Sequence, residues 1–308
     1  MEKHKIILVN RQAIGDVVVL TGLVRDLDIC YPGKFAVRVS TSHQGAVWAN
    51  NPHLASVKDC PAPPTSRVIK MHYGDQMRMA ANGVRMHFLE GFLHYFNTTV
   101  GGQYDAQVKL TKPKPDLHLT AEELSTKIVN PGKPYWVMMA GGKSDMTTKW
   151  HCKNSYQRVV DDLAKVGIPV VQCGGRSHYH PMLKNVTSLV GKTGSREFLR
   201  VIAQSAGVIC PITAAMHIAA AFDKPAVVIA GSREVPWWEA YPNHTWLGTI
   251  GKIHCGMKAC HACTTSQISK HRCKDFIRPG EEGVAIPVAR CMHLITSEMI
   301  VEAVRSYY

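Results

Sequence analysis

Short apolar runs alternate with amphipathic segments along most of the chain. Residues 5–9 form an apolar run typical of a buried strand, and residues 17–27 form an apolar segment of helical length. A glycine-containing loop at 10–15 separates them, and a second strand is predicted at 35–39. This order of strand, turn, helix and strand is the unit that builds parallel sheets.

The same alternation starts again after a segment rich in Pro and Gly at 130–134, which is the best candidate for a linker. The strands predicted beyond it are 135–140, 169–173, 207–210 and 226–230, and the helices are 154–166, 196–205 and 214–222. We therefore predict an α/β fold of two doubly wound, Rossmann-like domains facing each other across a cleft, residues 1–128 and 135–308. A last helix at 296–308 closes the structure.

Glycine and polar residues are concentrated just after the predicted strands. They lie at 15–16, 141–149, 174–175, 213–217 and 231–239. Ligands of doubly wound folds bind at the carboxyl ends of the strands, so we expect these five loops to line the cleft.

Gly15 and Asp16 lie between the first predicted strand and the first predicted helix. The Asp16 side chain could cap that helix, or it could accept a proton from a substrate hydroxyl at the floor of the cleft. The dipeptide alone does not separate these two roles.

The loop after the first strand of the second series carries groups that suit a phosphate. Gly141 and Gly142 allow close approach of the backbone. Thr147 and Thr148 offer hydroxyls, Lys149 adds a positive charge, and the next helix adds its N-terminal N–H groups. The spacing is not that of a Walker P-loop. The alternative is a surface loop with solvated lysines.

Two further loops carry candidates for the same ligand: Gly174, Gly175, Thr213, Ala214, Met216 and His217. Thr213 and the N-terminus of the Ala-rich helix that follows could hold a second phosphate. His217 could donate to a diphosphate, or it could be a buried polar residue.

The segment after the strand at 226–230 suits a sugar. Trp237 and Trp238 offer aromatic faces that stack on C–H surfaces, and Arg233 and Glu234 can bind hydroxyls. The alternative is a pair of core tryptophans beside a surface salt bridge.

Composition narrows the class of protein. Hydrophobic residues make up 45% of the 308, which allows a sizeable core and excludes intrinsic disorder as the main state. No apolar run reaches the roughly 18 residues that a membrane span needs. The N-terminal residues lack the apolar stretch of a signal peptide, so we expect a cytoplasmic protein.

The charge is strongly positive, with 36 Lys and Arg against 23 Asp and Glu, a net +13. A field of this sign favours an anionic partner: a nucleotide, a nucleic acid, a phosphorylated glycolipid or an anionic membrane surface. The chain has no block of Lys and Arg of the kind that marks a nucleic-acid-binding tail, so a basic protein without such a partner is the alternative.

Five of the ten cysteines crowd the C-terminal region, and four of them have the spacing of a metal site: Cys260, Cys263, Cys273 and Cys291. A Cys-x2-Cys pair with two later cysteines suits tetrahedral Zn²⁺ or Fe. Such a site would be closed and structural. The alternative is a set of free buried thiols.

Taken in order, these motifs resemble glycosyltransferase family 9, the heptosyltransferase-like enzymes of the GT-B fold. The matching residues are Gly15-Asp16, Tyr31-Pro32-Gly33, Asn51-Pro52-His53-Leu54, Ala140-Gly141-Gly142, Thr148-Lys149-Trp150, Gly191-Lys192-Thr193, Met216-His217-Ile218-Ala219-Ala220-Ala221, Lys224-Pro225, Arg290-Cys291-Met292 and Ile295-Thr296. The set in this order is specific, whereas each motif singly is not.

The resemblance implies an inverting transferase that uses a nucleoside-diphosphate sugar and no catalytic metal. Asp16 falls on the family's catalytic base. Thr148, Lys149, Thr213 and His217 fall on positions that hold the nucleotide diphosphate. Some relatives that modify autotransporters hold an iron ion on four cysteines in the region of the cysteine cluster.

The chain departs from the family pattern where Ile212-Thr213-Ala214 replaces Asp-Ser/Thr-Gly. The resemblance implies an anionic acceptor, a lipopolysaccharide or another glycan, with peripheral membrane contact as an option. The net charge of +13 keeps open a phage-type DNA glycosyltransferase that acts on a hydroxymethylated base. The absent acid keeps open a non-catalytic nucleotide-sugar-binding protein.

Overall fold

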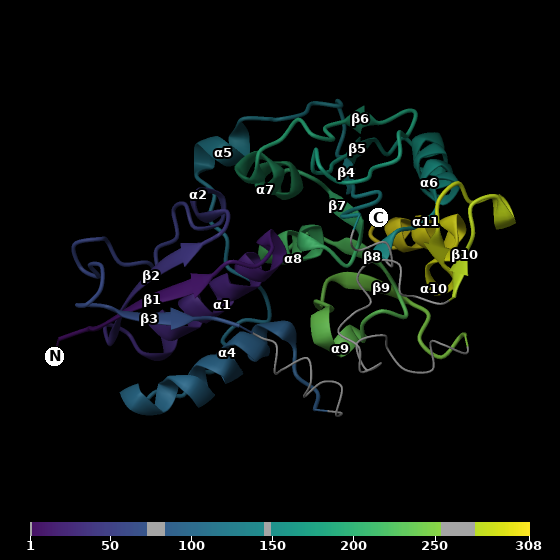
Figure 1. The fold of residues 1–308 in the computed structure, drawn as a ribbon. Coiled ribbons are helices and arrows are strands. Elements are labelled where there is room, and N and C mark those ends of the chain that lie inside the picture. The colour runs from purple at the N-terminus through teal and green to yellow at the C-terminus, as the bar shows by residue number, and fades with distance from the viewer. Residues whose placement is uncertain (1, 73–83, 145–148, 254–274) are drawn as a thin grey trace. The chain divides into compact units, whose positions relative to one another are not determined.

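The computed structural model describes residues 2–72, 84–144, 149–253 and 275–308 (Figure 1). The chain divides into two compact units, Met1–Ser125 and Thr126–Tyr308. The segment at 130–134, expected to be the linker, lies in the second unit a few residues beyond the point of division.

The first unit is built on a three-stranded parallel sheet with the strand order β2-β1-β3. The strands are β1 (His4–Asn10), β2 (Phe35–Thr41) and β3 (Arg67–Lys70). The helical elements are α1 (Ile14–Cys30), α2 (Gln44–Val47), α4 (Phe88–Thr99), the 3-10 turn η1 (Gly101–Tyr104) and α5 (Ala121–Ser125). Helix α1 contacts both β2 and α4, which explains why it is apolar around most of its circumference. Leu8, Leu20 and Phe92 are fully buried in this core.

The second unit is built on a six-stranded parallel sheet with the strand order β6-β5-β4-β7-β8-β9. The strands are β4 (Trp136–Met138), β5 (Val170–Gln172), β6 (Thr187–Ser188), β7 (Gly207–Pro211), β8 (Ala226–Gly231) and β9 (His244–Gly248). From β4 the chain builds outward through β5 and β6, and it then returns to place β7 on the other side of β4. The topological switch point of this sheet therefore lies between β4 and β7.

Helices cover the larger sheet, and a small antiparallel pair completes the unit. The helical elements are α6 (Lys153–Lys165), α7 (Ser195–Ala203), α8 (Ala214–Ala221), α9 (Pro236–Glu239), the 3-10 turn η5 (Glu281–Gly283), α10 (Arg290–His293) and α11 (Ser297–Arg305). The pair is β10 (Phe276–Ile277) with β11 (Val288–Ala289). Among the described residues, no helix combines the length and the apolar character that crossing a membrane requires.

The α/β fold class predicted from the sequence is confirmed, and so are the predicted strands and helices, with shifts of a few residues at their ends. Among the described residues, five strands were not predicted: β3, β6, β9 and the short pair β10 and β11. The first three are edges of the parallel sheets, where the apolar pattern that marks a strand buried on both faces is weak. The predicted last helix at 296–308 is α11, which begins at Ser297 and ends at Arg305.

Candidate functional site

The switch point of the second unit brings together two loops that are far apart in sequence. Lys149 belongs to the loop after β4, and Ile212 directly follows β7. The Nζ of Lys149 donates a hydrogen bond of 2.8 Å to the main-chain oxygen of Ile212. In doubly wound sheets the carboxyl edge at the switch point is where ligands bind, so Lys149 lies where the fold class predicts a ligand.

Helix α8 begins at this same edge. Thr213 is its N-cap residue with an extended backbone, and its side chain makes no capping hydrogen bond. The first N–H groups of a helix need partners from outside the helix, and they favour an anion. A lysine and a helix N-terminus therefore converge on one place, with Ala214 as the first helical residue.

Gly141 and Gly142 connect two loops of this edge. Gly141 has a φ of +93°, and a Cβ there would lie 2.1 Å from the main-chain oxygen of Tyr179. The N–H of Gly142 donates to the oxygen of Tyr179 at 2.9 Å, and the N–H of Tyr179 donates back at 3.0 Å. Because only glycine tolerates both the positive φ and this close approach, the two glycines join the loop after β4 to the segment after β5.

Gly174 lies in that segment after β5. A Cβ at Gly174 would meet the ring of His180 at 2.2 Å, so the imidazole packs directly on this glycine. The Nδ1 of His180 lies 2.5 Å from the oxygen of Ala140, and burial lowers the pKa of this histidine. Gly175 lies next to the His178 ring in the same way. These glycines thus make room for histidines in the second unit.

A buried group of charges lies between β8 and α9. The Nε of Arg233 donates to Glu234 Oε1 at 2.9 Å. Burial disfavours the ionised form of Glu234, but the positive charges of Lys149 and Arg233 outweigh it and lower the pKa of this carboxyl. Glu234 is therefore ionised and buried, while its partner Arg233 is partly buried. The salt bridge that the alternative interpretation placed on the surface thus has a buried acid.

Glu239, at the end of α9, is the uncharged partner of Glu234. Burial, and then the negative charge of Glu234, raise the pKa of Glu239 well above its ordinary value. The two carboxyl groups share a hydrogen bond. A protonated Glu239 can donate that hydrogen bond to an ionised Glu234. The two acids can therefore be buried together with only one negative charge between them.

His217 lies in the same group. It is 4% exposed, its Nδ1 lies 2.8 Å from the Tyr241 hydroxyl, and its Nε2 lies 3.9 Å from Glu239 Oε2. Burial raises the pKa of Tyr241 well above its ordinary value, so the phenol keeps its proton. His217 is thus a buried residue that contacts Tyr241 and Glu239, and its role as a donor to a diphosphate stays a prediction. Met216, beside it on α8, is fully buried.

The two tryptophans of the predicted sugar segment differ. Trp238 is 3% exposed, whereas Trp237 is half-buried. Both belong to α9, which begins at Pro236. Of the pair, Trp237 keeps ring surface that a ligand can reach.

In the first unit, Asp16 lies within helix α1 and not before it. The N-cap residue is Ala13, and Asp16 is the acidic residue of the first turn. Asp16 is therefore not the N-cap residue that the sequence suggested. A carboxylate in the first turn is favoured by the helix dipole. Asp16 is half-buried and follows the carboxyl end of β1, the central strand of its sheet, while Gly15 is buried.

Several sequence candidates lie outside the described residues: Thr147, Thr148, Cys260, Cys263 and Cys273. The fourth predicted metal ligand, Cys291, lies on α10 and is buried, and burial raises the pKa of its thiol. Cys291 is thus a thiol that stays protonated in the environment described, as a buried cysteine does before a metal displaces its proton.

Glu239 and Tyr241 were not predicted as site residues from the sequence. Glu239 follows Trp238 directly, and nothing in the local pattern marks it as a buried acid. Its role emerges from contacts with residues on α8 and in the loop after β8.

The sequence profile described as "Glycosyltransferase family 9 (heptosyltransferase)" matches residues 76–264. No curated protein matches the chain significantly.

Solved structures resemble the whole chain. A glycosyl transferase family 9 protein from Veillonella parvula DSM 2008 aligns with a TM-score of 0.66 and 12% identity over 100% of this chain and 98% of that one. The iron-containing dodecameric glycosyltransferase TibC from enterotoxigenic E. coli H10407 aligns with a TM-score of 0.65 and 15% identity. The alignment covers 100% of this chain and 80% of TibC. The E. coli ADP-heptose lipopolysaccharide heptosyltransferase II aligns with a TM-score of 0.57 and 12% identity, over 98% of each chain.

Proposed function

The chain belongs to glycosyltransferase family 9, and we propose that it transfers a sugar, with inversion, from a nucleoside-diphosphate sugar to a hydroxyl of an anionic glycan. Two neighbours support the choice of donor: TibC has been solved with ADP-D-β-D-heptose and the E. coli heptosyltransferase WaaC with ADP. The matches reported above give no support to a DNA acceptor or to a non-catalytic binder.

The observation that carries the proposal is the hydrogen bond between Lys149 and Ile212 at the switch point. It holds an ammonium group beside the N-terminus of α8, and these two features together suit a diphosphate. In the transition state negative charge grows on the leaving diphosphate, where Lys149, Thr213 and the helix N–H groups would stabilise it. Thr147 and Thr148 would add hydroxyl donors.

The segment from Arg233 to Trp238 would face the transferred sugar. The ring of Trp237 can stack on the C–H face of a pyranose. The fixed Arg233–Glu234 pair can order hydroxyl groups, because each of its members is already held in place by the other.

Asp16 would act as the general base. Its carboxylate takes the proton of the acceptor hydroxyl as that oxygen bonds to the anomeric carbon. The bond from this carbon to the diphosphate oxygen breaks, and its electron pair leaves with the nucleoside diphosphate. One displacement of this kind inverts the anomeric centre, with no covalent intermediate.

The four cysteines would form a structural metal site. Cys260, Cys263 and Cys273 would join Cys291, and a thiolate set of this kind holds Zn²⁺ or Fe. The resemblance to the iron-containing glycosyltransferase TibC supports iron. The ion would tie the C-terminal segment to its unit.

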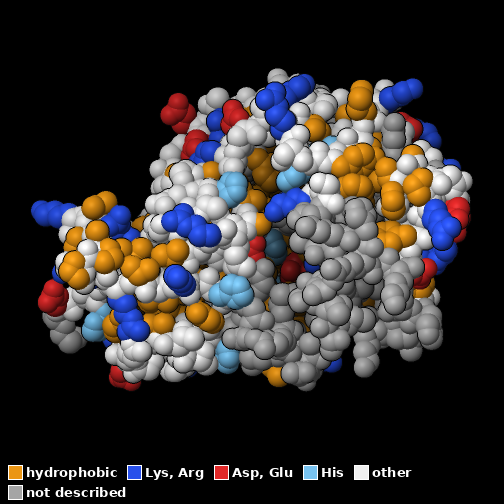
Figure 2. Space-filling view, viewed as in Figure 1, with side chains coloured by type: hydrophobic (Ala, Val, Ile, Leu, Met, Phe, Trp, Pro, Cys, Tyr) orange, Lys and Arg blue, Asp and Glu red, His pale blue; other side chains and the backbone are white. Residues whose placement is uncertain are grey.

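The positive charge supports an anionic acceptor. On the face seen in Figure 2, Lys and Arg side chains lie in several separate places, with fewer Asp and Glu among them. A broad field of this kind attracts phosphorylated glycans without a single dense patch.

Mass spectrometry tests the proposal. The protein is incubated with pooled nucleotide sugars and truncated lipopolysaccharide core, and in parallel with hydroxymethylated duplex DNA. A gain of one hexose or heptose on the glycolipid is the expected result. A gain on the DNA nucleoside instead would move the acceptor to nucleic acid, and donor binding without transfer or hydrolysis would reduce the protein to a binder.

A further inference from the structure

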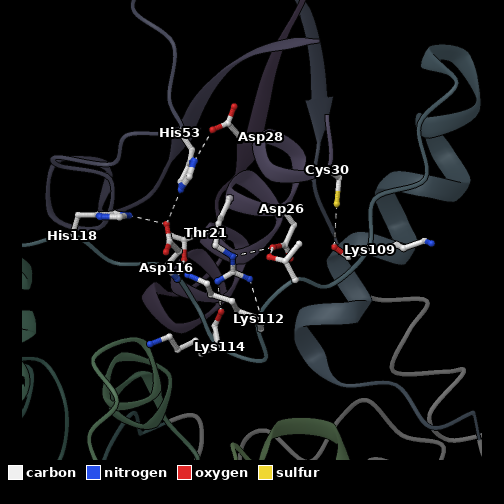
Figure 3. Close-up of polar contacts among 12 residues, drawn as sticks. Thr21, Asp26, Asp28, Cys30, His53, Lys109, Lys112, Lys114, Asp116 and His118 are labelled. Carbon is white, nitrogen blue, oxygen red and sulfur yellow. Dashed lines mark hydrogen bonds and ion pairs between the residues drawn. The ribbon is translucent and has the colours of Figure 1, made fainter. Parts of the chain in front are cut away.

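Two histidines and an aspartate meet in the first unit, at a place that the proposed transfer reaction does not use. They are His53, Asp116 and His118, and one ligand atom from each lies within 4.8 Å of the others (Figure 3). All three are partly buried, with 17%, 18% and 29% of their side chains exposed, so an ion from solvent can reach them.

The chain holds these three residues on well-anchored segments. His53 lies in the loop after α2, where its N–H donates to the Asn51 side chain at 2.9 Å. The N–H of Asp116 donates to Thr21 Oγ1 on α1 at 2.7 Å. The buried Arg25, also on α1, donates to the main-chain oxygens of Lys112 and Lys114 at 3.0 and 2.7 Å. The segment that carries Asp116 and His118 is therefore fixed against α1.

The orientation of His53 is set by Asp28, near the end of α1. The Nδ1 of His53 lies 2.8 Å from Asp28 Oδ2. Its other nitrogen, Nε2, turns toward Asp116 Oδ2 at 3.5 Å, which is longer than a hydrogen bond. A carboxylate that fixes one imidazole nitrogen so that the other can bind an ion is the usual outer shell of a zinc site.

The spacing of the ligand atoms suits a transition metal. Zinc lies about 2.0–2.1 Å from nitrogen and oxygen ligands, so two ligands at tetrahedral angles are roughly 3.3 Å apart. The pair of His53 and Asp116 already has nearly this separation. His118 Nε2 lies closer to the same Asp116 oxygen, at 2.7 Å, and would move back by a few tenths of an ångström when an ion enters.

We propose that His53, Asp116 and His118 bind a divalent transition-metal ion, with Zn²⁺ as the fitting probe, and that Asp28 orients His53 for it. Two imidazoles and a carboxylate suit zinc and its neighbours better than Mg²⁺ or Ca²⁺, which take oxygen ligands. Water completes the coordination. The ion joins the loop after α2 to the segment before α5, and its role is structural.

The test counts metal ions on the full chain. After metal removal, the protein is titrated with Zn²⁺, and the stoichiometry is compared among wild type, His53→Ala, His118→Ala and the control His94→Ala, which removes a histidine of α4 outside the cluster. Wild type and the control should bind one more ion per chain than the two cluster variants. Equal stoichiometry in all four proteins overturns the proposal.

Cobalt distinguishes this site from the proposed cysteine site. Co²⁺ bound to thiolates gives intense charge-transfer absorption in the near ultraviolet, which nitrogen and oxygen ligands do not give. Co²⁺ at the cysteine site has visible d–d bands of its own. His118→Ala should therefore lower the visible d–d absorption by the share of the histidine site, while the thiolate charge-transfer bands stay unchanged. A loss confined to the thiolate bands contradicts the assignment.

Asp28→Asn provides a test that does not remove a ligand. Loss of an outer-shell carboxylate weakens metal affinity about 10–100-fold, so this variant should still bind one ion, at a higher concentration. His118→Gln serves if His118→Ala does not fold, as judged by circular dichroism. Unchanged zinc affinity in a folded Asp28→Asn and in a folded His118→Gln rejects the site.

Discussion

The Nζ of Lys149 lies 2.8 Å from the main-chain oxygen of Ile212. The two residues are 63 positions apart, and they meet because β4 and β7 are neighbours in the sheet although two other strands separate them in sequence. The lysine is thus held in position by the main chain of the protein, and its charge also lowers the pKa of the buried Glu234.

Lys149→Ala should weaken binding of a nucleoside diphosphate about 10–100-fold, because a charge-assisted hydrogen bond contributes about 1.5–3 kcal/mol. Isothermal titration calorimetry measures this. Lys143→Ala is the matched control, since Lys143 is an exposed lysine of the same loop. Equal affinities in the two variants would remove Lys149 from the donor site.

Asp16→Asn should reduce turnover roughly 10²–10⁴-fold while donor binding stays as in wild type, because the amide cannot take a proton. The measurement pairs a rate of sugar transfer with calorimetry of the donor. Asp59→Asn, an exposed carboxylate of the same unit, should leave both unchanged. Wild-type turnover in Asp16→Asn would assign the base to another group.

The buried acids Glu234 and Glu239 should respond unequally to the same substitution. Glu239→Gln replaces a protonated acid by an amide of the same shape, so it should lower the free energy of unfolding by less than about 1 kcal/mol. Glu234→Gln leaves Arg233 and Lys149 without their buried counter-charge, so it should lower the free energy of unfolding by about 3–5 kcal/mol. Urea denaturation at neutral pH measures both. Similar losses would mean that both acids are ionised.

The pH dependence of the two acids has opposite signs. The pKa of Glu239 is raised in the folded state, so its stabilising contribution is present at low pH and is lost as the pH rises through the raised value. The pKa of Glu234 is lowered, so its contribution is present above the ordinary glutamate value and is lost as the pH falls. When stability is measured by denaturation across a pH series, Glu239→Gln should therefore lose the decline in stability with rising pH and keep the decline with falling pH.

His151 should make the protein sensitive to acid. Its Nδ1 accepts from the N–H of Cys152 at 2.7 Å, its Nε2 lies 2.7 Å from the oxygen of Ile295, and burial lowers its pKa to about 4. The unfolded chain binds a proton here at about pH 6.5, so stability falls between pH 6.5 and 4, by about 3 kcal/mol. Denaturation midpoints across this range should show a shallower decline in His151→Gln than in wild type. Parallel declines in the two proteins would contradict the prediction.

Much of the fold follows from local pattern, and part of the site does not. Val17–Leu20 and Val227–Ile229 are continuous runs of apolar residues, and every side chain in them is buried. Such runs predict a buried helix and a buried strand from the sequence alone. Gly141 and Lys149 were found for a similar reason, since a glycine loop after a strand has a recognisable form. Glu239 was not, because an acid becomes buried through partners that lie elsewhere in the sequence.

The metal-ligand cluster was missed for the same reason. His53 and Asp116 are 63 residues apart, and each lies in irregular chain where no periodicity predicts which way a side chain points. The motif that contains His53 contributed to the family resemblance, but it carried no information about Asp116 or Asp28.

The paired hydrogen bonds between Gly142 and Tyr179 have a kinetic consequence. They tie the loop after β4 to the segment after β5 by main-chain bonds alone, so no side-chain substitution can remove this connection directly. Among related nucleotides that bind at this edge of the sheet, differences in affinity should therefore be expressed mainly in the dissociation rate.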